Sequence, residues 1–244
     1  MYGITAKGTL DGFQGPNPNP GKVFKITADG AFIPLHSFSA NALVGKHSSL
    51  VVGNDGAFYG MTGEGRFGDA KTFFKVTSDS ACITLGSFDN IPFRDLIKGS
   101  NGNFYGVTTE GGTGAHKGGT VFEVTPAGAV TTLVSFDSDK GNGESPQAGL
   151  VVGSDGNFYG TTAGGGNSSA GTVFKLTPAG VLTTLVSFDY MNGRYPTAAL
   201  VEGNDGNFYG TTGVGGEFDL GTAFKVTPAG GLTKLITFNE ANGR

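Results

Sequence analysis

Few residues in this chain have types and spacings that could support metal binding. The segment Asp137–Glu144 has oxygen-bearing side chains at alternating positions, as a calcium-binding loop does. It lacks the full ladder of oxygen ligands and the closing Glu of an EF-hand loop, so we interpret it as a polar loop between strands. The three histidines are scattered, and no two have the spacing of helical or hairpin metal ligands: His36, His47 and His116. The sequence therefore predicts neither a metal site nor a cofactor.

Motifs for nucleotide binding and nucleophilic catalysis are equally weak. The segment Gly63–Gly68 matches the G-x-G-x-x-G fingerprint, which cradles a pyrophosphate only where a strand leads into a helix. Here the segment lies between two predicted antiparallel strands of a glycine-rich chain, so we attribute the match to composition. The sequence also lacks the G-x-S-x-G motif of serine hydrolases. We predict no catalytic residues.

The strongest chemical candidates are aromatic and charged side chains in the irregular segments between predicted strands. Aromatic rings beside polar groups suit flat, hydroxylated ligands such as sugars. In a second interpretation, which stays open at this point, the rings cover the ends of the strands as loop packing. The candidate ligand-binding residues are Phe13, Arg66, Phe67, Phe93, Arg94, Tyr190, Arg194, Tyr195, Phe218 and Asp219.

The composition indicates a folded, turn-rich protein. Of the 244 residues, 45 are Gly, while 20 Phe and 7 Tyr supply enough apolar surface for a core. The formal net charge is −4 and no basic residues cluster, which argues against nucleic-acid binding. The single cysteine, Cys82, allows no internal disulfide. We also expect no membrane span and no signal peptide in this chain.

An internal repeat organises the chain. Tyr-Gly recurs at intervals of 57, 46, 54 and 50 residues, at Tyr2, Tyr59, Tyr105, Tyr159 and Tyr209. The fourth repeat contains four runs rich in Val, Thr, Phe and Tyr, each bounded by turn residues, which is typical of β-strands. These predicted strands span residues 150–153, 158–162, 172–177 and 182–188.

Tight turns and longer loops alternate between the predicted strands. Asp155-Gly156 joins the first strand to the second and suits a type I′ hairpin turn, which needs positive φ angles. Pro178-Ala-Gly180 joins the third strand to the fourth, with Gly in the left-handed conformation. Longer loops join the second strand to the third and join successive repeats, so they lie together at one end of the strands. We call this end the loop face and expect recognition there, because loops on rigid scaffolds usually carry function.

The second strand of each repeat indicates stacked sheets. Phe158 and Tyr159 are adjacent, so their side chains point to opposite sides of the sheet. A sheet buried on both faces must lie between two others, as a blade does in a β-propeller, and Gly160 would let a neighbouring blade approach closely. We therefore predict an all-β fold, a single β-propeller domain over residues 1–244 with five blades of four antiparallel strands. The blade at the chain ends lacks its first strand, and the blades span residues 1–38, 48–88, 95–136, 149–188 and 199–238.

Five-bladed propellers can be glycosidases that use carboxylate pairs on their innermost strands. The variable position of the first strand holds Val52, Lys98, Val152 and Glu202 in successive repeats. One carboxylate and one cation do not make an acid and base pair. Glu202 with Lys98 could bind a ligand near the axis or form a solvated charge pair, and both readings stay open.

The repeat resembles the GloVer tandem repeat of bacterial "choice-of-anchor" surface proteins. The resemblance covers all five repeats, and the residues that carry it most clearly are Gly149–Gly160, Gly171–Lys175 and Leu182–Phe188. It implies an extracellular or cell-surface protein without established catalytic residues.

Together these patterns predict a non-catalytic, secreted or cell-surface propeller that binds a glycan or a surface protein through its loop face. Two alternatives stay open. One is a purely structural repeat module of a longer surface protein. The other, with less support, is a polysaccharide-degrading enzyme.

Overall fold

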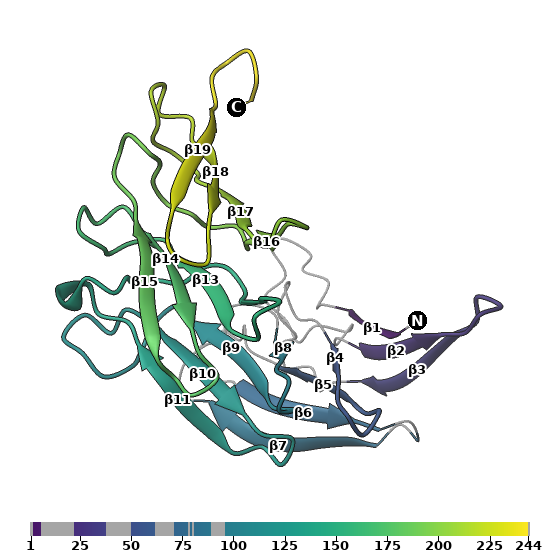
Figure 1. The fold of residues 1–244 in the computed structure, drawn as a ribbon. Helices are drawn as coiled ribbons and strands as arrows, with labels where there is room; N and C mark the ends of the chain where they lie inside the picture. Colours follow the sequence, from purple (N-terminus) through teal and green to yellow (C-terminus); the bar gives the residue numbers. More distant parts are fainter. Residues whose placement is uncertain are drawn as a thin grey trace, which may run out of the picture. The chain divides into compact units, whose positions relative to one another are not determined.

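The structure, a computed structural model, describes residues 2–5, 22–37, 50–61, 71–77, 79, 81–88 and 96–243. Within these residues the chain forms nineteen strands and one turn of 3-10 helix, η1 (Ser138–Lys140) (Figure 1). No helix of this part of the chain is long and apolar enough to cross a membrane.

Each repeat forms one antiparallel sheet in which consecutive strands are neighbours. The first sheet has three strands, β1 (Tyr2–Thr5), β2 (Lys22–Ile26) and β3 (Phe32–Ser37). The other four sheets have four strands each. The second sheet consists of β4 (Val51–Val52), β5 (Phe58–Met61), β6 (Lys71–Val76) and β7 (Cys82–Phe88), and the third of β8 (Ile97–Lys98), β9 (Phe104–Thr108), β10 (Thr120–Val124) and β11 (Val130–Ser135). The fourth sheet consists of β12 (Val151–Val152), β13 (Phe158–Thr162), β14 (Thr172–Leu176) and β15 (Leu182–Ser187). The fifth consists of β16 (Val201–Glu202), β17 (Phe208–Thr211), β18 (Thr222–Val226) and β19 (Leu232–Thr237). The predicted four-stranded blades, one without its first strand, are confirmed.

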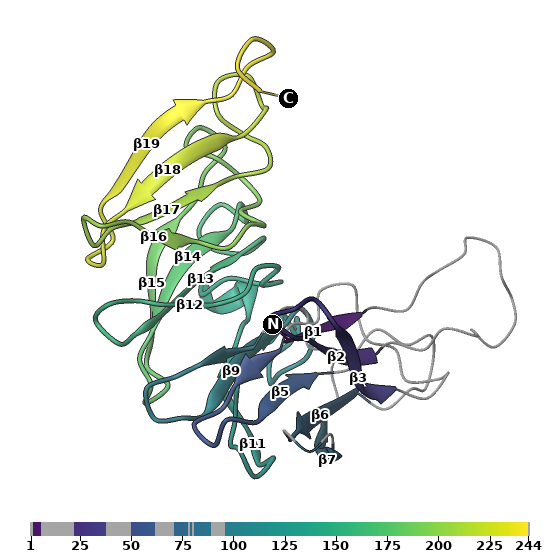
Figure 2. The same ribbon diagram turned by 90° about the vertical axis from the view of Figure 1, so that its right-hand side faces the viewer.

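Aromatic rings of the second strands join successive sheets. The tyrosine of one sheet stacks on the phenylalanine of the next, with ring centroids 4.0 Å apart in Tyr2–Phe58, 4.4 Å in Tyr59–Phe104, 4.2 Å in Tyr105–Phe158 and 3.8 Å in Tyr159–Phe208. All residues of β5, β9 and β13 are buried, as expected for strands covered on both faces. The last two sheets share one core and lie side by side in Figures 1 and 2. Within each unit the sheets therefore stack face to face, as the adjacent Phe158 and Tyr159 predict.

The glycine after each tyrosine has a different role from the predicted one. Gly160 is paired with Phe174 of β14 in its own sheet. A Cβ atom on Gly160 would lie 2.5 Å from Cζ of Phe174, so the phenylalanine ring covers the glycine. The same ring contact, at 2.6 Å, recurs at Gly3, Gly60, Gly106 and Gly210. The expected close approach of a neighbouring blade is wrong, because a cross-strand neighbour at about 5 Å is nearer than a stacked sheet at about 10 Å.

The hairpin turns between first and second strands also differ from the expected type I′ turn. Gly156 has a φ of 76° and donates a hydrogen bond to the carbonyl of Gly153 at 2.9 Å. Asp155 does not have the positive φ that a type I′ turn requires at both central positions. Its carboxylate instead accepts the N–H of Asn157 at 3.0 Å, which is an Asx turn. The turn is therefore a β-turn followed by a left-handed glycine. The Pro178-Ala-Gly180 turn has the predicted left-handed glycine, with a φ of 85° at Gly180.

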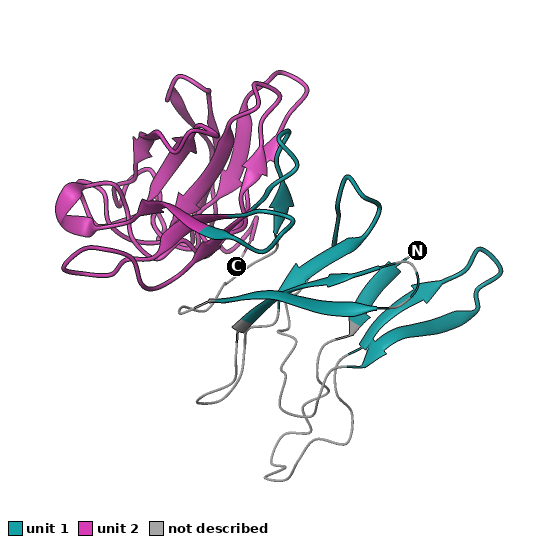
Figure 3. Ribbon diagram, turned by 90° about the horizontal axis from the view of Figure 1, so that it is seen from below, with its two compact units in different colours: residues 1–104, 124–130 teal, residues 105–123, 131–244 magenta. Residues whose placement is uncertain are grey.

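The chain divides into two compact units (Figure 3). The first comprises residues 1–104 and 124–130, and the second comprises residues 105–123 and 131–244. A core around Val23, Phe58, Phe74 and Val76 holds the first unit together. The second contains a core that includes Tyr159, Val173, Phe188, Phe208 and Phe224. That all five repeats act as a single domain stays a prediction.

Candidate functional site

The candidate site lies on the loop face of the second unit, which is formed by two kinds of loop. Hairpin loops join the second strand of a sheet to the third and span residues 109–119, 163–171 and 212–221. Connecting loops join successive sheets and span residues 136–150 and 188–200.

Repeated main-chain hydrogen bonds hold these loops in place. Glu144 of one connecting loop and Gly164 of the next hairpin loop exchange two hydrogen bonds of 2.9 and 3.0 Å. Arg194 and Val214 form the equivalent pair one repeat later, at 2.8 and 3.2 Å. Paired threonine hydroxyls are buried at the base of each hairpin loop, at Thr108–Thr120, Thr162–Thr172 and Thr212–Thr222. The backbone therefore forms a common framework, and the side chains on it differ between repeats.

Two equivalent positions in the connecting loops show which features the shared backbone requires. Ser145 and Tyr195 have φ angles of 53° and 55°, and each exchanges the same kind of hydrogen bonds with the hairpin loops on either side. Because a serine supports this backbone in one connecting loop, the tyrosine ring is not required for it in the other. The preceding residues also differ between the two loops: Glu144 comes before Ser145, and Arg194 comes before Tyr195. The shared backbone therefore requires neither an arginine nor a tyrosine at these positions.

Three of the predicted site residues form a stack in which the two tyrosines are exposed and the arginine is half-buried. The guanidinium carbon of Arg194 lies 4.1 Å from the ring centroid of Tyr195 and 4.9 Å from that of Tyr190. Arg194 also donates a hydrogen bond to the hydroxyl of Tyr195. Tyr190 is 54% exposed and Tyr195 is 38% exposed. A guanidinium over two aromatic faces is held by cation–π attraction, so the stack is ordered although it faces solvent.

Arg194 has no acidic partner within the described residues. None of the ion pairs found there involves it, and its Nε atom is buried without a hydrogen-bond partner. Guanidinium groups bind carboxylates through two parallel hydrogen bonds. The stack therefore presents an unneutralised cation between two rings.

The other predicted site residues divide into two groups. Phe218 is 52% exposed, and its hairpin loop is attached to the stack because the N–H of Gly216 donates to the carbonyl of Tyr190 at 2.8 Å. Asp219 accepts the N–H of Gly215 at 2.8 Å, so one carboxylate oxygen closes its own loop. Sequence reasoning missed Met191, which is 66% exposed beside Tyr190, although it too interrupts the repeat. The remaining candidates lie outside the described residues: Phe13, Arg66, Phe67, Phe93 and Arg94.

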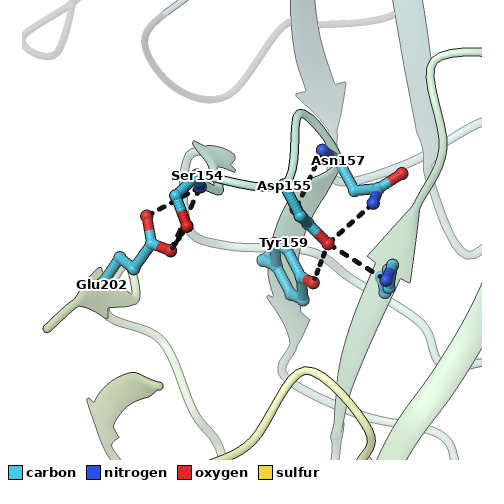
Figure 4. Close-up of polar contacts among 6 residues, drawn as sticks. Ser154, Asp155, Asn157, Tyr159 and Glu202 are labelled. Carbon is cyan, nitrogen blue, oxygen red and sulfur yellow. Dashed lines mark hydrogen bonds and ion pairs between the residues drawn. The ribbon is translucent and has the colours of Figure 1, made fainter. Parts of the chain in front are cut away.

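A second set of polar clusters lies at the opposite end of the strands, and sequence reasoning missed it. Asp155 accepts hydrogen bonds from the Tyr159 hydroxyl at 2.8 Å and from the Asn157 amide at 2.7 Å (Figure 4). Lys175 pairs with the same carboxylate at 3.1 Å. Asp55, Tyr59 and Lys75 form the equivalent cluster in the first unit. The sequence pattern that could have revealed these two clusters is an Asp four residues before the Tyr and a Lys sixteen residues after it.

The hydrogen bonds within these clusters shift the pKa values of their members. The hydrogen bond from Lys75 lowers the pKa of Asp55 to about 2. At Asp155 burial raises the pKa, but the hydrogen bonds from Asn157, Tyr159 and Lys175 together lower it further than burial raises it. Burial, followed by the hydrogen bond to Asp155, raises the pKa of Tyr159. A tyrosine held protonated in this way cannot act as a base near neutral pH.

The third repeat has a related cluster in which the carboxylate comes from the third strand, at the position of the lysine. Asn101 replaces the aspartate and Glu123 replaces the lysine. Tyr105 now donates its hydroxyl to Glu123 at 2.6 Å. The tyrosine therefore keeps a carboxylate acceptor in either arrangement, which supports a role in holding the second and third strands together.

Acid should destabilise the protein through these clusters. A carboxylate whose pKa is lower in the folded than in the unfolded state stabilises the fold above its unfolded pKa of about 4, and this contribution is lost as pH falls through its folded pKa. For Asp55 the expected window runs from about pH 4 to about pH 2. The free energy of unfolding, measured by denaturant titration at several pH values, should fall across this window. The decline should be shallower in Asp55→Asn, and an unchanged slope would contradict the assignment.

Glu202 and Lys98 lie in different units, and each bonds to a hairpin turn within its own unit. A joint ligand site of the two stays a prediction. The carboxylate of Glu202 accepts three hydrogen bonds, from the N–H of Ser154 at 2.9 and 3.1 Å and from its hydroxyl at 2.6 Å (Figure 4). Lys98 donates to the side-chain carbonyl of Asn54 at 3.1 Å. In both cases the first strand of one sheet is bound to the hairpin turn of the preceding sheet.

The segment Asp137–Glu144 forms the predicted polar loop. Asp137 accepts the N–H of Asp139 and caps η1, while Glu144 pairs through its main chain with Gly164. Its oxygen atoms therefore do not form the alternating ladder of a calcium loop.

Solved structures similar to the chain are β-propeller proteins. Puromycin hydrolase is 14% identical, with a TM-score of 0.62 over 96% of this chain and 35% of its own. A gluconolactonase from Xanthomonas campestris is 16% identical, with a TM-score of 0.50 over 91% of this chain and 73% of its own. TolB from Acinetobacter baumannii is 12% identical, with a TM-score of 0.51 over 86% of this chain and 47% of its own. At such identities the similarity shows the fold alone.

The stacked four-stranded sheets and their repeated sequence define a β-propeller built from tandem repeats. A family model described as the Gloeobacter/Verrucomicrobia repeat matches residues 89–244. The chain belongs to this family, which confirms the resemblance seen in the sequence. No curated protein sequence matches the chain.

Proposed function

We propose that this propeller is a non-catalytic binding module, and that its loop face binds a glycan carrying an acidic group. The observation that carries the proposal is the stack of Tyr190, Arg194 and Tyr195, in which the arginine has no acidic partner within the described residues. The aromatic rings offer apolar faces to a sugar ring. The guanidinium offers hydrogen-bond donors to a carboxylate or sulfate.

The family resemblance supports a location outside the cell or on the cell surface, where glycans are accessible. Several weak sites on a repeated scaffold would bind a polymer with increased avidity.

A glycan array of acidic and neutral members tests the proposal. The chain should bind acidic glycans, and Arg194→Ala should weaken binding roughly ten- to a hundredfold, because a hydrogen bond to a charged group contributes about 1.5–3 kcal/mol. Tyr195→Ala should weaken binding as well. Both variants should keep the melting temperature of the parent chain, since the matched connecting loop folds with Glu144 and Ser145 in these places.

Glu144→Ala is the matched control, because Glu144 occupies the position of Arg194 in the preceding connecting loop. It should bind as the parent chain does. An array without any binding would remove the glycan proposal. Equal losses in Glu144→Ala and Arg194→Ala would show that the stack is not the site.

A protein partner is the second candidate, favoured by the residue types on the same surface. Tyr, Arg, Phe and Met are enriched in protein interfaces. The exposed residues here are Tyr190, Met191, Tyr195 and Phe218, and Arg194 is half-buried among them. Affinity capture from surface extracts with immobilised chain tests this candidate. A genuine partner should be retained by the parent chain and by Glu144→Ala, and lost with Arg194→Ala.

A further inference from the structure

The third repeat brings three potential metal ligands together on the loop face. Nε2 of His116 and Oδ1 of Asp139 lie 3.1 Å apart. One ligand atom from each of His116, Asp137 and Asp139 lies within 4.8 Å of the other two. His116 belongs to the hairpin loop 109–119, and the two aspartates belong to the connecting loop 136–150. The cluster is well separated in sequence from Tyr190 and Arg194, so it is a different site.

Insertions in both loops create this cluster. The paired threonines at the base of the hairpin loop are 12 residues apart in the third repeat and 10 apart in the fourth and fifth. In the connecting loop, the N–H of Asp137 bonds to a side-chain amide 5 residues later, whereas the equivalent bonds of Asp189 and Asn239 span 3 residues. His116 and Asp139 lie in the two enlarged loops. Neither His116 nor Asp139 is therefore needed by the main-chain framework that the repeats share.

Asp137 adds a buried carboxylate to the cluster. The residue is 4% exposed, and Oδ1 accepts the N–H of Asp139 at 3.2 Å. Within the described residues no donor contacts Oδ2. Gly114 keeps space beside that oxygen, because a Cβ there would lie 2.7 Å from it. Among the described residues, the side-chain atoms buried without a hydrogen-bond partner are Thr161 Oγ1 and Arg194 Nε. Oδ2 of Asp137 therefore keeps contact with solvent and is open to a cation.

No side-chain cation fills this role in the described part of the chain. Lys117 and Lys140 adjoin the cluster in sequence, but neither forms an ion pair with it. His116 contacts Asp139 alone. Two carboxylates beside one imidazole leave net negative charge at a place with nitrogen and oxygen donors, which suits a divalent cation.

We propose that His116, Asp137 and Asp139 bind a divalent transition-metal ion of the zinc class, with water in the remaining positions. Imidazole nitrogen favours zinc and similar ions over calcium and magnesium, which prefer oxygen ligands. In a tetrahedral zinc site with bonds of about 2.1 Å, the ligand atoms lie about 3.4 Å apart. Nε2 of His116 and Oδ1 of Asp139, at 3.1 Å, are already near this spacing, and the whole cluster lies within 4.8 Å. The side chains of His116 and Asp139 are 52% and 67% exposed, so both are free to adjust around an ion.

Zinc chloride added to the chelator-treated full chain tests the site. Calorimetry should show one saturable site, and zinc should raise the melting temperature. His116→Ala and Asp139→Asn should each weaken binding at least tenfold, since loss of a mere outer-shell partner already costs about that much. Circular dichroism should show that both variants fold, because both side chains are exposed.

Asp137→Asn separates the metal-binding role from the structural one. Asn239 caps the equivalent turn in the fifth repeat, accepting the N–H groups of Ala241 and Asn242. Asp137→Asn should therefore keep the fold and lose zinc affinity. Glu110→Gln, an exposed acid in the same hairpin loop, should bind zinc as the parent chain does. Absence of saturable zinc binding, unchanged affinity in His116→Ala, or calcium binding as tight as zinc would each overturn the proposal.

Discussion

Replacing Phe174 by Ala should lower the free energy of unfolding by about 3–5 kcal/mol. Its ring is fully buried and makes two kinds of contact. It covers Gly160 within its own sheet, and it contacts Phe136, which directly follows β11 of the preceding sheet, at a centroid distance of 5.2 Å. The glycine has no side chain that could fill the vacated space, so a cavity would remain.

Denaturant unfolding followed by circular dichroism measures this loss. Leu235→Ala provides the control, because Leu235 is a β19 residue that is 52% exposed. It should change the free energy of unfolding by no more than about 0.5–1 kcal/mol. A loss below about 1 kcal/mol for Phe174→Ala would contradict the packing described here.

Gly160→Ala should destabilise the chain by about 1–3 kcal/mol, through overpacking instead of a cavity. The new methyl group would lie 2.5 Å from Cζ of Phe174 and 3.1 Å from Cδ2 of Leu150. The ring cannot retreat freely, because the neighbouring sheet occupies its other side. The substitution should therefore shift strands β13 and β14 apart or displace the ring from its favoured rotamer.

A double-mutant cycle tests whether Gly160 and Phe174 act as a pair. In the Phe174→Ala background the ring is absent, so Gly160→Ala should cost much less than it does in the parent chain. Additive losses in the double variant would mean that the glycine is required for another reason. The cycle also distinguishes the observed cross-strand contact from the blade-to-blade contact that sequence reasoning suggested.

The proposed glycan-binding site and the proposed metal site both lie on loops that are fixed by main-chain hydrogen bonds. Main-chain hydrogen bonds fix the loops, as the bridges at Glu144–Gly164 and Arg194–Val214 show, and side chains at the loop tips vary from repeat to repeat. One repeat carries small polar residues where another carries an aromatic and cationic stack. Substitutions at the tips should therefore change binding with little effect on stability, while substitutions in the framework should do the reverse.

Sequence alone determined the repeating unit of this protein, its strand order and the two-sided packing of its sheets. These features depend on local patterns, namely turn residues at regular spacing and the adjacent Phe158 and Tyr159, and such patterns are legible within a single repeat. The same local patterns identified the loops that carry Tyr190, Arg194 and Tyr195. The turn type around Asp155 was predicted wrongly, because its carboxylate forms hydrogen bonds that a dipeptide preference does not include.

Only the tertiary structure decided which side chains meet. Arg194 could have faced any of several polar groups, and its position between two tyrosines follows from the bridge to Val214 and the path of the connecting loop. His116 appeared isolated in the sequence, yet it contacts Asp139, which is 23 residues away. Contacts of this range arise when separate loops are fixed side by side on stacked sheets. Spacing along the chain does not encode them, because each loop reaches its partner only after the sheets beneath it have packed.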